Sequence, residues 1–367
     1  MTGIDRQTAV DRQAAYAGTR EVPAALAFDA ARLETWLIDQ VEGFRGPLTI
    51  SQFKGGQSNP TYLLETPGRA YVLRRKPPGK LLASAHAVDR EYRVLTALAA
   101  QGFPIAAPLA YCADETVVGT PFYVMAHVAG RVFWDPAMPG AEPSERALVY
   151  DAMNATLARL HALDPAAIGL ADFGRPEGYV ARQVKRWSEQ YRLSETETIP
   201  EMDRLMAWLP DAVPPTARPA LVHGDYRLDN LILRADAPEV AAVLDWELAT
   251  LGDPNADAVY HLMAWVMPRS DSGGGTGTLA GLDLAALGLP SLETYADLYA
   301  RRMGLSEIPH LETLMAYNLF RFAAILQGIA GRVRDGTATN ANAAVMASEV
   351  RPLAAEGWRW AVRAGAR

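Results

Sequence analysis

Short apolar runs bounded by turn residues dominate the first third of the chain. Three such runs, residues 48–53, 60–66 and 70–75, are separated by the segments KGGQSN and PGR. Gly, Pro and Asn between short apolar runs are typical of β-strands joined by turns. Two more strand-like runs follow at 108–113 and 121–128. The pattern predicts a β-rich first region.

Helical spacing interrupts these strands only once. From Ser84 onward, apolar residues recur every three or four positions until Gly102, where a glycine is expected just beyond a helix end. Ahead of the first strand, Asp29 is a candidate N-cap for another helix that carries Leu33 and Leu37. Residues 1–27 lack periodicity, and we expect them to form a loosely attached arm.

The pattern changes to long amphipathic helices after residues 126–130. An apolar stretch at 221–233 and a strand at 240–246 interrupt this second region. Its expected helices are 144–163, 178–193, 201–209, 254–267, 291–303, 311–333 and 340–363. The sequence therefore predicts an α+β protein with three parts: an arm and helix at 1–44, a β lobe at 45–127 and a larger, mostly helical lobe at 128–367.

Composition narrows the class of protein. A length of 367 residues is more than a single core usually serves, which agrees with two lobes. The net charge of −7 argues against a nucleic-acid-binding protein, because such proteins usually carry a basic stripe. The single Cys112 excludes an internal disulfide, and no apolar run is long enough to span a bilayer. A polar start shows no signal peptide, so we expect a soluble cytoplasmic protein without nucleic-acid or membrane partners.

Polar side chains cluster between two apolar runs in the stretch LVHGDYRLDNLIL, residues 221–233. It contains Asp225 and Asn230, and Asp245 follows at the end of the next predicted strand. Mg²⁺ takes oxygen ligands, usually one or two protein groups together with phosphate oxygens. A further carboxylate beside such a site can accept the proton of an attacking hydroxyl. These residues supply the minimum equipment for phosphoryl transfer.

This cluster is similar to the catalytic core shared by aminoglycoside phosphotransferases, choline kinases and protein kinases. The shared pattern is His-x-Asp-x-x-x-x-Asn, followed by a strand that ends in Asp. The local form HGDYRLDNLIL…VLDWELATLGDPNAD most resembles the aminoglycoside phosphotransferase family. The segments FKGGQSNPTYLL, YVLRRKPPGKLLASAHAVDREYRVL and GYVARQVKRW resemble a branch that includes kinase-like domains fused to some acyl-CoA dehydrogenases. This resemblance covers about residues 45–340. It implies a bilobal protein-kinase-like fold, with a small antiparallel sheet and one main helix in the N-lobe and a helical C-lobe.

The resemblance also implies roles for the polar cluster. Asp225 matches the catalytic base, and Asn230 and Asp245 match the ligands of Mg²⁺. Arg227 occupies the position of a cation that neutralises the transferring phosphoryl group. His223 is expected to hold the loop as a hydrogen-bonded scaffold. Asp257, in GDPNAD, resembles the acid that braces this loop from the next helix.

The β lobe is expected to bind the nucleotide. The turn KGGQSN resembles the family's phosphate-covering turn, in which Gly55, Gly56 and Ser58 would approach phosphate, although a plain hairpin turn would look the same. Backbone groups from Met125 to His127 would face the base. No side chain in this segment distinguishes adenine from guanine, so both ATP and GTP stay open as donors.

An arginine replaces the strand lysine of kinases. The segment YVLRR aligns Arg74 with that position, while Arg75 and Lys76 leave the register open by one or two residues. Glu91 supports Arg74 because it lies on the apolar stripe of its helix, where a carboxylate is costly unless it is paired. The alternative is that Glu91 lies at the edge of the stripe and reaches water.

The acceptor of the phosphate is expected to be a small molecule with a hydroxyl group. Pro254 comes only nine positions after Asp245, which is too short a distance for the activation segment that protein kinases use to bind peptides. We expect the acceptor pocket in helices 178–210 and 291–335. Acids there would suit a polycationic antibiotic: Glu189, Glu195, Glu197, Glu201 and Asp203. Arginines there would suit an anionic acceptor such as a hydroxyacyl-CoA: Arg301, Arg302, Arg321, Arg332 and Arg334. Either set could instead be a solvated helix face.

Two alternatives come from other functional classes. One is an inactive, nucleotide-binding pseudokinase that serves as an interaction module, which only the arginine at the lysine position favours. The other is a metal-dependent hydrolase that uses His223, Asp225 and Asp245. Zinc hydrolases generally need more histidine ligands than this chain brings together, since its six His show no paired spacing.

Overall fold

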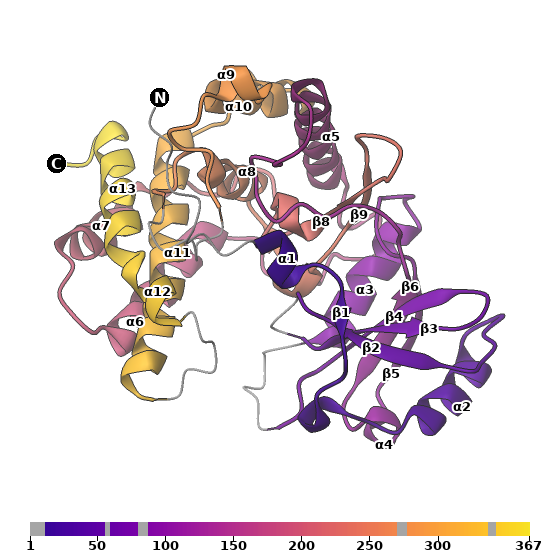
Figure 1. Ribbon diagram of the computed structural model, residues 1–367. Helices are drawn as coiled ribbons and strands as arrows, with labels where there is room; N and C mark the ends of the chain where they lie inside the picture. Colours follow the sequence, from indigo (N-terminus) through magenta and orange to yellow (C-terminus); the bar gives the residue numbers. More distant parts are fainter. Residues whose placement is uncertain (1–11, 56–58, 80–86, 270–276, 337–342) are drawn as a thin grey trace, which may run out of the picture.

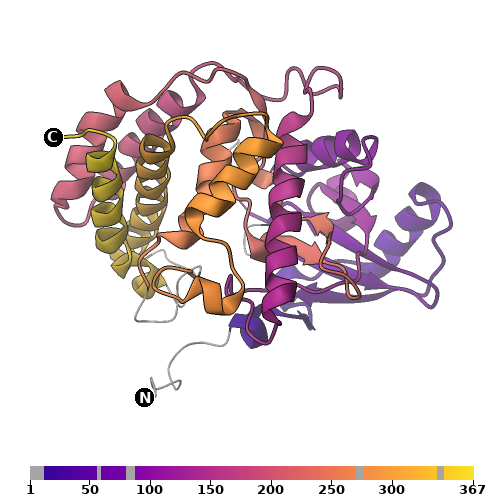
Figure 2. The same ribbon diagram turned by 90° about the horizontal axis from the view of Figure 1, so that it is seen from above.

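Two lobes make up the structure, a computed structural model (Figure 1). A strand-rich N-lobe lies beside a larger helical C-lobe, and the two views agree on this arrangement (Figure 2). The structure describes residues 12–55, 59–79, 87–269, 277–336 and 343–367. The expected α+β, protein-kinase-like architecture is confirmed, and no helix in these ranges is long and apolar enough to cross a membrane.

The N-lobe is built on one six-stranded antiparallel sheet in the order β1-β2-β3-β4-β6-β5. Its strands are β1 (Thr19–Arg20), β2 (Thr49–Phe53), β3 (Thr61–Glu65), β4 (Ala70–Arg75), β5 (Pro108–Cys112) and β6 (Phe122–Ala126). The helices of this part are α1 (Arg12–Tyr16), α2 (Ala30–Gln40), α3 (Val88–Ala99) and α4 (Glu115–Val118). The five strands expected from the sequence are all present, and β1 adds a sixth.

The two faces of this sheet are buried differently. On one face, Leu33 and Leu37 of α2 pack with Tyr62 and Leu64 in a core that belongs to the N-lobe alone. On the other face, α3 joins the sheet to the main core, which continues through the C-lobe. The lobes therefore share apolar packing through α3.

The segment before β2 is attached more firmly than the sequence predicts. β1 pairs with β2, and Gln13 in α1 donates a hydrogen bond to the carbonyl oxygen of Val132 at 3.0 Å. Tyr16 packs against Trp134 of the C-lobe with ring centroids 5.0 Å apart. Apolar periodicity could not reveal this attachment because hydrogen bonds, the contact between Tyr16 and Trp134 and the packing of Val22 on the N-lobe core provide it. The prediction of a loose arm is wrong for residues 12–27.

Helices form most of the C-lobe. They are α5 (Pro143–Ala162), α6 (Tyr179–Ser194), α7 (Pro200–Ala212), α8 (Pro254–Leu262), α9 (Leu284–Leu287), α10 (Leu292–Arg302), α11 (Leu311–Arg334), α12 (Ala343–Ser348) and α13 (Val350–Arg363). α11 lies at the centre and packs against α6, α8 and α13. The single helix expected at 340–363 is divided in two, and the helix expected at 254–267 ends at Leu262, where a 3-10 turn follows.

Two small antiparallel sheets interrupt the helices. The strands expected in the stretch 221–233 and at 240–246 take part in them, whereas a further strand at 250–252 was not expected. β7 (Ala220–Val222) pairs with β10 (Thr250–Gly252), whereas β8 (Leu231–Leu233) pairs with β9 (Val240–Val243). The two apolar ends of the stretch 221–233 thus belong to different sheets. The polar residues between them form the connecting loop, which is held at both ends.

Candidate active site

The loop after β7 is anchored by Asp257 from α8. The carboxylate of Asp257 accepts hydrogen bonds from the backbone N–H groups of His223 and Gly224, each at 2.8 Å. His161 lies 3.1 Å from the same carboxylate. Burial alone would raise the pKa of Asp257, but the hydrogen bonds from His161 and from the loop backbone hold it below its usual value. A buried carboxylate that stays ionised fixes the start of the loop, which agrees with the expected brace.

His223 holds the loop from within. Its side chain is fully buried, and Nε2 lies 2.8 Å from the carbonyl oxygen of Leu244. Nδ1 lies 3.2 Å from the backbone nitrogen of Asp225, which can only donate, so Nδ1 accepts and Nε2 carries the proton. Both ring nitrogens are therefore occupied. This argues against the hydrolase alternative, which needs His223 as a metal ligand.

The carboxylate of Asp225 receives contacts from three side chains. Asn230 Nδ2 donates to Oδ2 at 3.0 Å, and the hydroxyl of Tyr260 donates to Oδ1 at 2.6 Å. Arg227 Nε lies 3.1 Å from Oδ1 as an ion pair. The carboxylate is 22% exposed, so it is held in place yet remains accessible.

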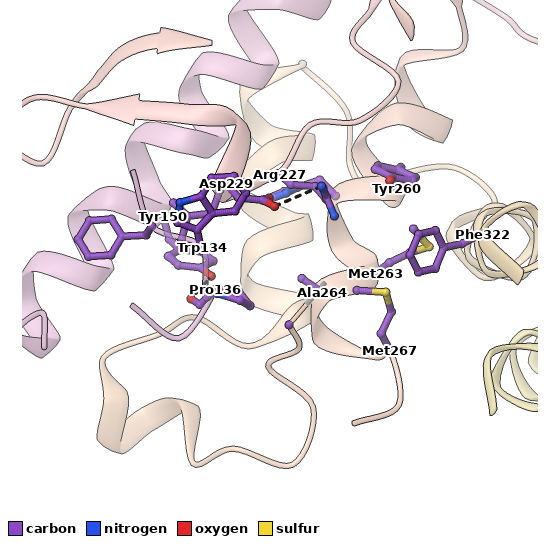
Figure 3. A pocket seen from close by; sticks show the side chains of 14 residues that line it. Trp134, Pro136, Tyr150, Arg227, Asp229, Tyr260, Met263, Ala264, Met267 and Phe322 are labelled. Atoms are coloured by element: carbon purple, nitrogen blue, oxygen red, sulfur yellow. Dashed lines mark hydrogen bonds and ion pairs between the residues drawn. The ribbon is translucent and has the colours of Figure 1, made fainter. Parts of the chain in front are cut away.

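Arg227 lies between two acids of its own loop. Besides Asp225, its guanidinium contacts Asp229, with Nη2 3.2 Å from Oδ2, as the dashed line in Figure 3 marks. Burial would lower the pKa of Arg227, but the two carboxylates outweigh it and raise the pKa above its usual value. The cation is therefore fixed beside the expected base.

Asn230 and Asp245 are brought together by the backbone. The N–H of Leu244 donates to the carbonyl oxygen of Asn230 at 2.8 Å, which places Asp245 next to it. Asp245 has φ +63°, a left-handed conformation that turns the chain out of β9. Asn230 Nδ2 donates to both the carbonyl oxygen and Oδ2 of Asp225, so its Oδ1 is directed away from Asp225. An amide oxygen and a partly exposed carboxylate are hard oxygen donors that fit Mg²⁺.

Arg74 on β4 links the lobes at this point. Its Nε lies 2.8 Å from Glu91 Oε2, and its Nη2 lies 2.6 Å from Asp245 Oδ1. Glu247 Oε2 is 3.4 Å away. Burial would lower the pKa of Arg74, but Glu91 and Asp245 raise it above its usual value. The ion pair expected between Arg74 and Glu91 is present, and it selects Arg74 over its neighbours in YVLRR.

Glu91 does not reach water. Its side chain is 2% exposed, and it accepts hydrogen bonds from Asn59 Nδ2 at 2.7 Å and from the hydroxyl of Tyr123 at 3.0 Å. Burial raises the pKa of Glu91 above its usual value, although Arg74 and these hydrogen bonds oppose the shift. The alternative of an edge position is wrong.

The other N-lobe residues expected at the nucleotide are only partly placed. Gly55 is described, while Gly56 and Ser58 lie outside the described residues. Met125 is buried in β6, and the N–H of His127 donates to the carbonyl oxygen of Ala70 at 3.4 Å. The His127 N–H is therefore already paired within the sheet.

A cavity opens to solvent beside Arg227 (Figure 3), with about 510 Å³ of space between the atoms when its open part is included. Most of the side chains that line it are apolar: Phe133, Trp134, Pro136, Leu228, Met263, Ala264, Met267 and Phe322. Polar atoms come from Arg227, Asp229, Tyr150, Tyr260 and His261. The expectation of a pocket in helices 178–210 and 291–335 is wrong for this cavity, because only Phe322 comes from those ranges.

The charged residues expected around an acceptor mostly pair elsewhere. Glu195 and Asp203 form ion pairs with Arg192, and Glu197 pairs with Arg351. Glu189 and Glu201 also do not line the cavity.

The arginines of the second set are also directed elsewhere. Arg302 pairs with Asp151 at 2.8 Å, and Arg334 pairs with Asp335. Arg321 is buried against Tyr260, with its guanidinium 5.2 Å from the ring centroid. Arg301 and Arg332 are not among the cavity residues. Neither charged set shapes the cavity.

Two residues of the site were missed from the sequence. Tyr260 lies three positions after Asp257 on α8, so both side chains lie on the same face of the helix. That spacing could have revealed Tyr260. Trp134 lines the cavity and is reached by the N-terminal segment, and no local pattern signals either contact.

Comparison with known proteins places this geometry in a family. A family model described as the phosphotransferase enzyme family matches residues 49–298. The chain is 43% identical to acyl-CoA dehydrogenase family member 10 of Mus musculus over 353 residues, and 39% identical to acyl-CoA dehydrogenase family member 11 of Homo sapiens over 336. These matches cover 95% and 90% of this chain but only 33% and 43% of the relatives. The chain thus spans less than half the length of these curated relatives.

Solved structures agree. A protein from Ralstonia eutropha, named as a proposed aminoglycoside phosphotransferase, is 48% identical with a TM-score of 0.83, over 92% of this chain and 99% of the other. Choline kinase from Cryptosporidium parvum shares the fold at 9% identity and a TM-score of 0.61, over 91% and 96% of the two chains. An aminoglycoside phosphotransferase in complex with ADP and hygromycin B has 18% identity and a TM-score of 0.57, over 91% and 99%. The chain belongs to the phosphotransferase enzyme family, with a kinase-like fold.

Proposed function

We propose that this protein is a kinase that transfers the γ-phosphoryl group of ATP to a hydroxyl of a small amphipathic molecule. The observation that carries this proposal is the bonded unit of Asp225, Asn230 and Asp245 beside an apolar cavity. Because the base and both metal-ligand positions are intact, the pseudokinase alternative loses its support.

The nucleotide would lie between the lobes. Arg74, held by Glu91, would contact phosphate oxygens, and the turn of Gly55, Gly56 and Ser58 would cover them. Met125 to His127 would face the base. ATP is favoured over GTP because solved structures of the same fold carry ADP or AMP-PNP.

Asn230 Oδ1 and the Asp245 carboxylate would hold Mg²⁺. When bound, this ion supplies charge neutralisation to the phosphate oxygens. Arg74 now pairs with Asp245 at 2.6 Å, so the guanidinium occupies one oxygen that faces the same site. Nucleotide binding would move this guanidinium toward phosphate and free the carboxylate.

Asp225 is the proposed base. It takes the proton of the acceptor hydroxyl while that oxygen forms a bond to the γ-phosphorus. The bond from the γ-phosphorus to the bridging oxygen breaks, and its electron pair leaves with ADP. Arg227, fixed between Asp225 and Asp229, lies where negative charge collects on the transferring group.

The cavity indicates the class of acceptor. Aromatic and methionine side chains suit an alkyl or acyl segment, whereas a polycationic aminoglycoside needs several acids. Among the described residues that line the cavity, Asp229 is the one acid, and Arg227 already neutralises it. A hydroxyacyl thioester, such as a hydroxyacyl-CoA, fits this lining. Relatives named as acyl-CoA dehydrogenase family members support the same class. The arginines proposed to attract an anionic acceptor give no support, because they do not line the cavity.

A thermal-shift assay followed by kinetics tests this function. ATP should stabilise the protein, and Mg²⁺ should increase the stabilisation. Hydroxyacyl-CoA esters should then be phosphorylated, while kanamycin-like compounds should turn over poorly. Efficient phosphorylation of the antibiotics, with no phosphorylation of the thioesters, would contradict the proposed acceptor class. If neither ATP nor GTP stabilised the protein, the proposal of a kinase would be contradicted.

A further inference from the structure

Tyr260 donates a hydrogen bond to one carboxylate oxygen of the proposed base, Asp225. It lies on α8, and its ring lines the cavity while its hydroxyl donates to Asp225 Oδ1 at 2.6 Å. The label in Figure 3 shows Tyr260 on the side of the cavity that also holds Arg227. Burial raises the pKa of Tyr260 far above its usual value, so the hydroxyl remains a donor. The contact is therefore a hydrogen bond from a neutral phenol to a carboxylate.

The two oxygens of Asp225 differ in what they can still accept. A carboxylate oxygen has about two lone-pair positions. Oδ1 accepts a hydrogen bond from Tyr260 at 2.6 Å, and Arg227 Nε lies 3.1 Å from the same oxygen as an ion pair, so two side chains cover Oδ1. Oδ2 faces Asn230 Nδ2 at 3.0 Å, which leaves one of its positions for another donor. Each oxygen thus accepts one hydrogen bond, but Oδ1 is also covered by the Arg227 guanidinium, so an acceptor hydroxyl meets fewer side chains at Oδ2.

Tyr260 is itself held in place. The guanidinium of Arg321, from α11, lies 5.2 Å from the centroid of the Tyr260 ring. Arg321 Nη2 also donates to the carbonyl oxygen of Gly224 at 3.1 Å, directly before Asp225 in the chain. Arg321 is 7% exposed and does not line the cavity. It therefore connects the tyrosine to the loop that carries the base.

We propose that Tyr260 is a positioning residue that selects Oδ2 of Asp225 as the oxygen that receives the proton. The proposal rests on the proposed function. The proton of the acceptor O–H moves to Oδ2 as the new O–P bond forms and the bond to the bridging oxygen of ATP breaks. Tyr260 keeps its own proton throughout. Without its hydroxyl, Oδ1 would compete for the acceptor, and the carboxylate could rotate away from the reacting geometry.

Tyr260→Phe tests this role because it removes one oxygen and keeps the ring in the cavity. The probe is Mg·ATP with water as acceptor, since hydrolysis uses the same base. We expect kcat to fall about 10-fold, with KM for ATP unchanged within about 2-fold. Tyr62→Phe is the matched control, because its buried hydroxyl donates to Leu26 in the N-lobe, remote from Asp225. This control should retain the wild-type kcat.

A double-mutant cycle separates positioning from a general loss of structure. In the Asp225→Asn background, adding Tyr260→Phe should change kcat by less than about 2-fold, because both changes act through one carboxylate. A full 10-fold loss in that background would overturn the proposal. So would a wild-type kcat in Tyr260→Phe alone.

Two further measurements keep the test decisive. If Tyr260→Phe unfolds, Arg321→Lys serves as the test variant, because it loosens the contact that holds the Tyr260 ring. Arg321→Lys should lower kcat about 3-fold at constant KM. An unchanged kcat in this variant would overturn the proposal. If the wild-type protein hydrolyses no ATP and phosphorylates no hydroxyacyl-CoA, the proposed function fails, and this inference fails with it. ATP turnover that depends on Asp225 but not on Tyr260 would overturn this inference alone.

Discussion

Two arginines, the buried Arg74 and the half-buried Arg227, face the same site from opposite lobes, and their partners are arranged differently. Arg74 contacts Glu91 of α3 and Asp245 of the C-lobe, residues 17 and 171 positions away. Arg227 contacts Asp225 and Asp229, each two positions away in its own loop. The first arrangement exists only when the lobes are assembled. The second is built into one short segment.

This difference separates two tasks. A buried guanidinium needs carboxylate partners, and removing one partner leaves a charge uncompensated. Removing a partner of Arg74 would destabilise the contact between the lobes, where the nucleotide is proposed to bind. Removing a partner of Arg227 would destabilise the loop that carries the proposed base. Substitutions at the two arginine sites should therefore affect different steps, binding in one and turnover in the other.

Among the substitutions at the site, Asp225→Asn should reduce turnover most strongly. We expect kcat to fall by about 100-fold or more, the scale of losing a general base, while nucleotide affinity stays nearly unchanged. Steady-state kinetics and a nucleotide titration would measure the two quantities. Asp236→Asn is a matched control, because it makes the same change in an exposed ion pair with Arg234. A wild-type kcat in Asp225→Asn would remove the base assignment.

Asp245→Ala should weaken nucleotide binding. It removes a proposed Mg²⁺ ligand and one partner of Arg74, so the affinity for Mg·ATP should fall about 10-fold or more. Calorimetry with AMP-PNP, with and without Mg²⁺, would measure it. The benefit that Mg²⁺ gives to nucleotide affinity should disappear in this variant. If that benefit persisted at full size, the metal would be held elsewhere.

The comparison also shows how far sequence could predict the site. The resemblance placed Arg74 at the position of the strand lysine, Glu91 on an apolar stripe supported a cation there, and the ion pair between the two is present. The grouping of the polar residues in the loop 223–230 was equally predictable, because they are neighbours in the chain. Trp134 and the cavity were not, since the lining comes from segments near 134, 263 and 322 that only the fold brings together.

Surface charge was the least predictable feature of the fold. Arg302 has its partner Asp151 on another helix, 151 positions away. In the sequence Arg302 therefore looks like part of a binding surface, whereas in the structure it forms an ion pair between two helices. The N-terminal arm shows the converse: Gln13 and Tyr16 look unremarkable in the sequence and connect α1 to the C-lobe.

Arg74 and Glu91 should behave as one unit in nucleotide binding. Arg74→Met and Glu91→Gln should each weaken affinity for Mg·ATP, and the double variant should lose less than the sum. We expect a coupling free energy above about 0.5 kcal/mol. Binding titrations on the wild type and all three variants would provide it. Strictly additive losses would mean that the ion pair at 2.8 Å does not position Arg74 for the nucleotide.

Arg75→Met is expected to have the smallest effect on the site, and it sharpens the comparison most directly. Arg75 follows Arg74 on the same strand, so its side chain is directed to the opposite face of the sheet. There it donates to the carbonyl oxygens of Val118 at 2.6 Å and Leu26 at 2.7 Å, and its guanidinium lies over the ring of Phe28. Its partners are carbonyl groups and an aromatic ring, which indicates a structural role.

Nucleotide affinity in Arg75→Met should therefore stay within about 2-fold of wild type. The free energy of unfolding should fall by about 2 kcal/mol, because buried carbonyl acceptors lose their donors. Urea unfolding and the same nucleotide titration would measure both quantities. Arg74→Met is the natural counterpart, since the same substitution one residue earlier should reduce affinity. A loss of affinity in Arg75→Met equal to that in Arg74→Met would mean that the face of the sheet does not decide which arginine serves the nucleotide.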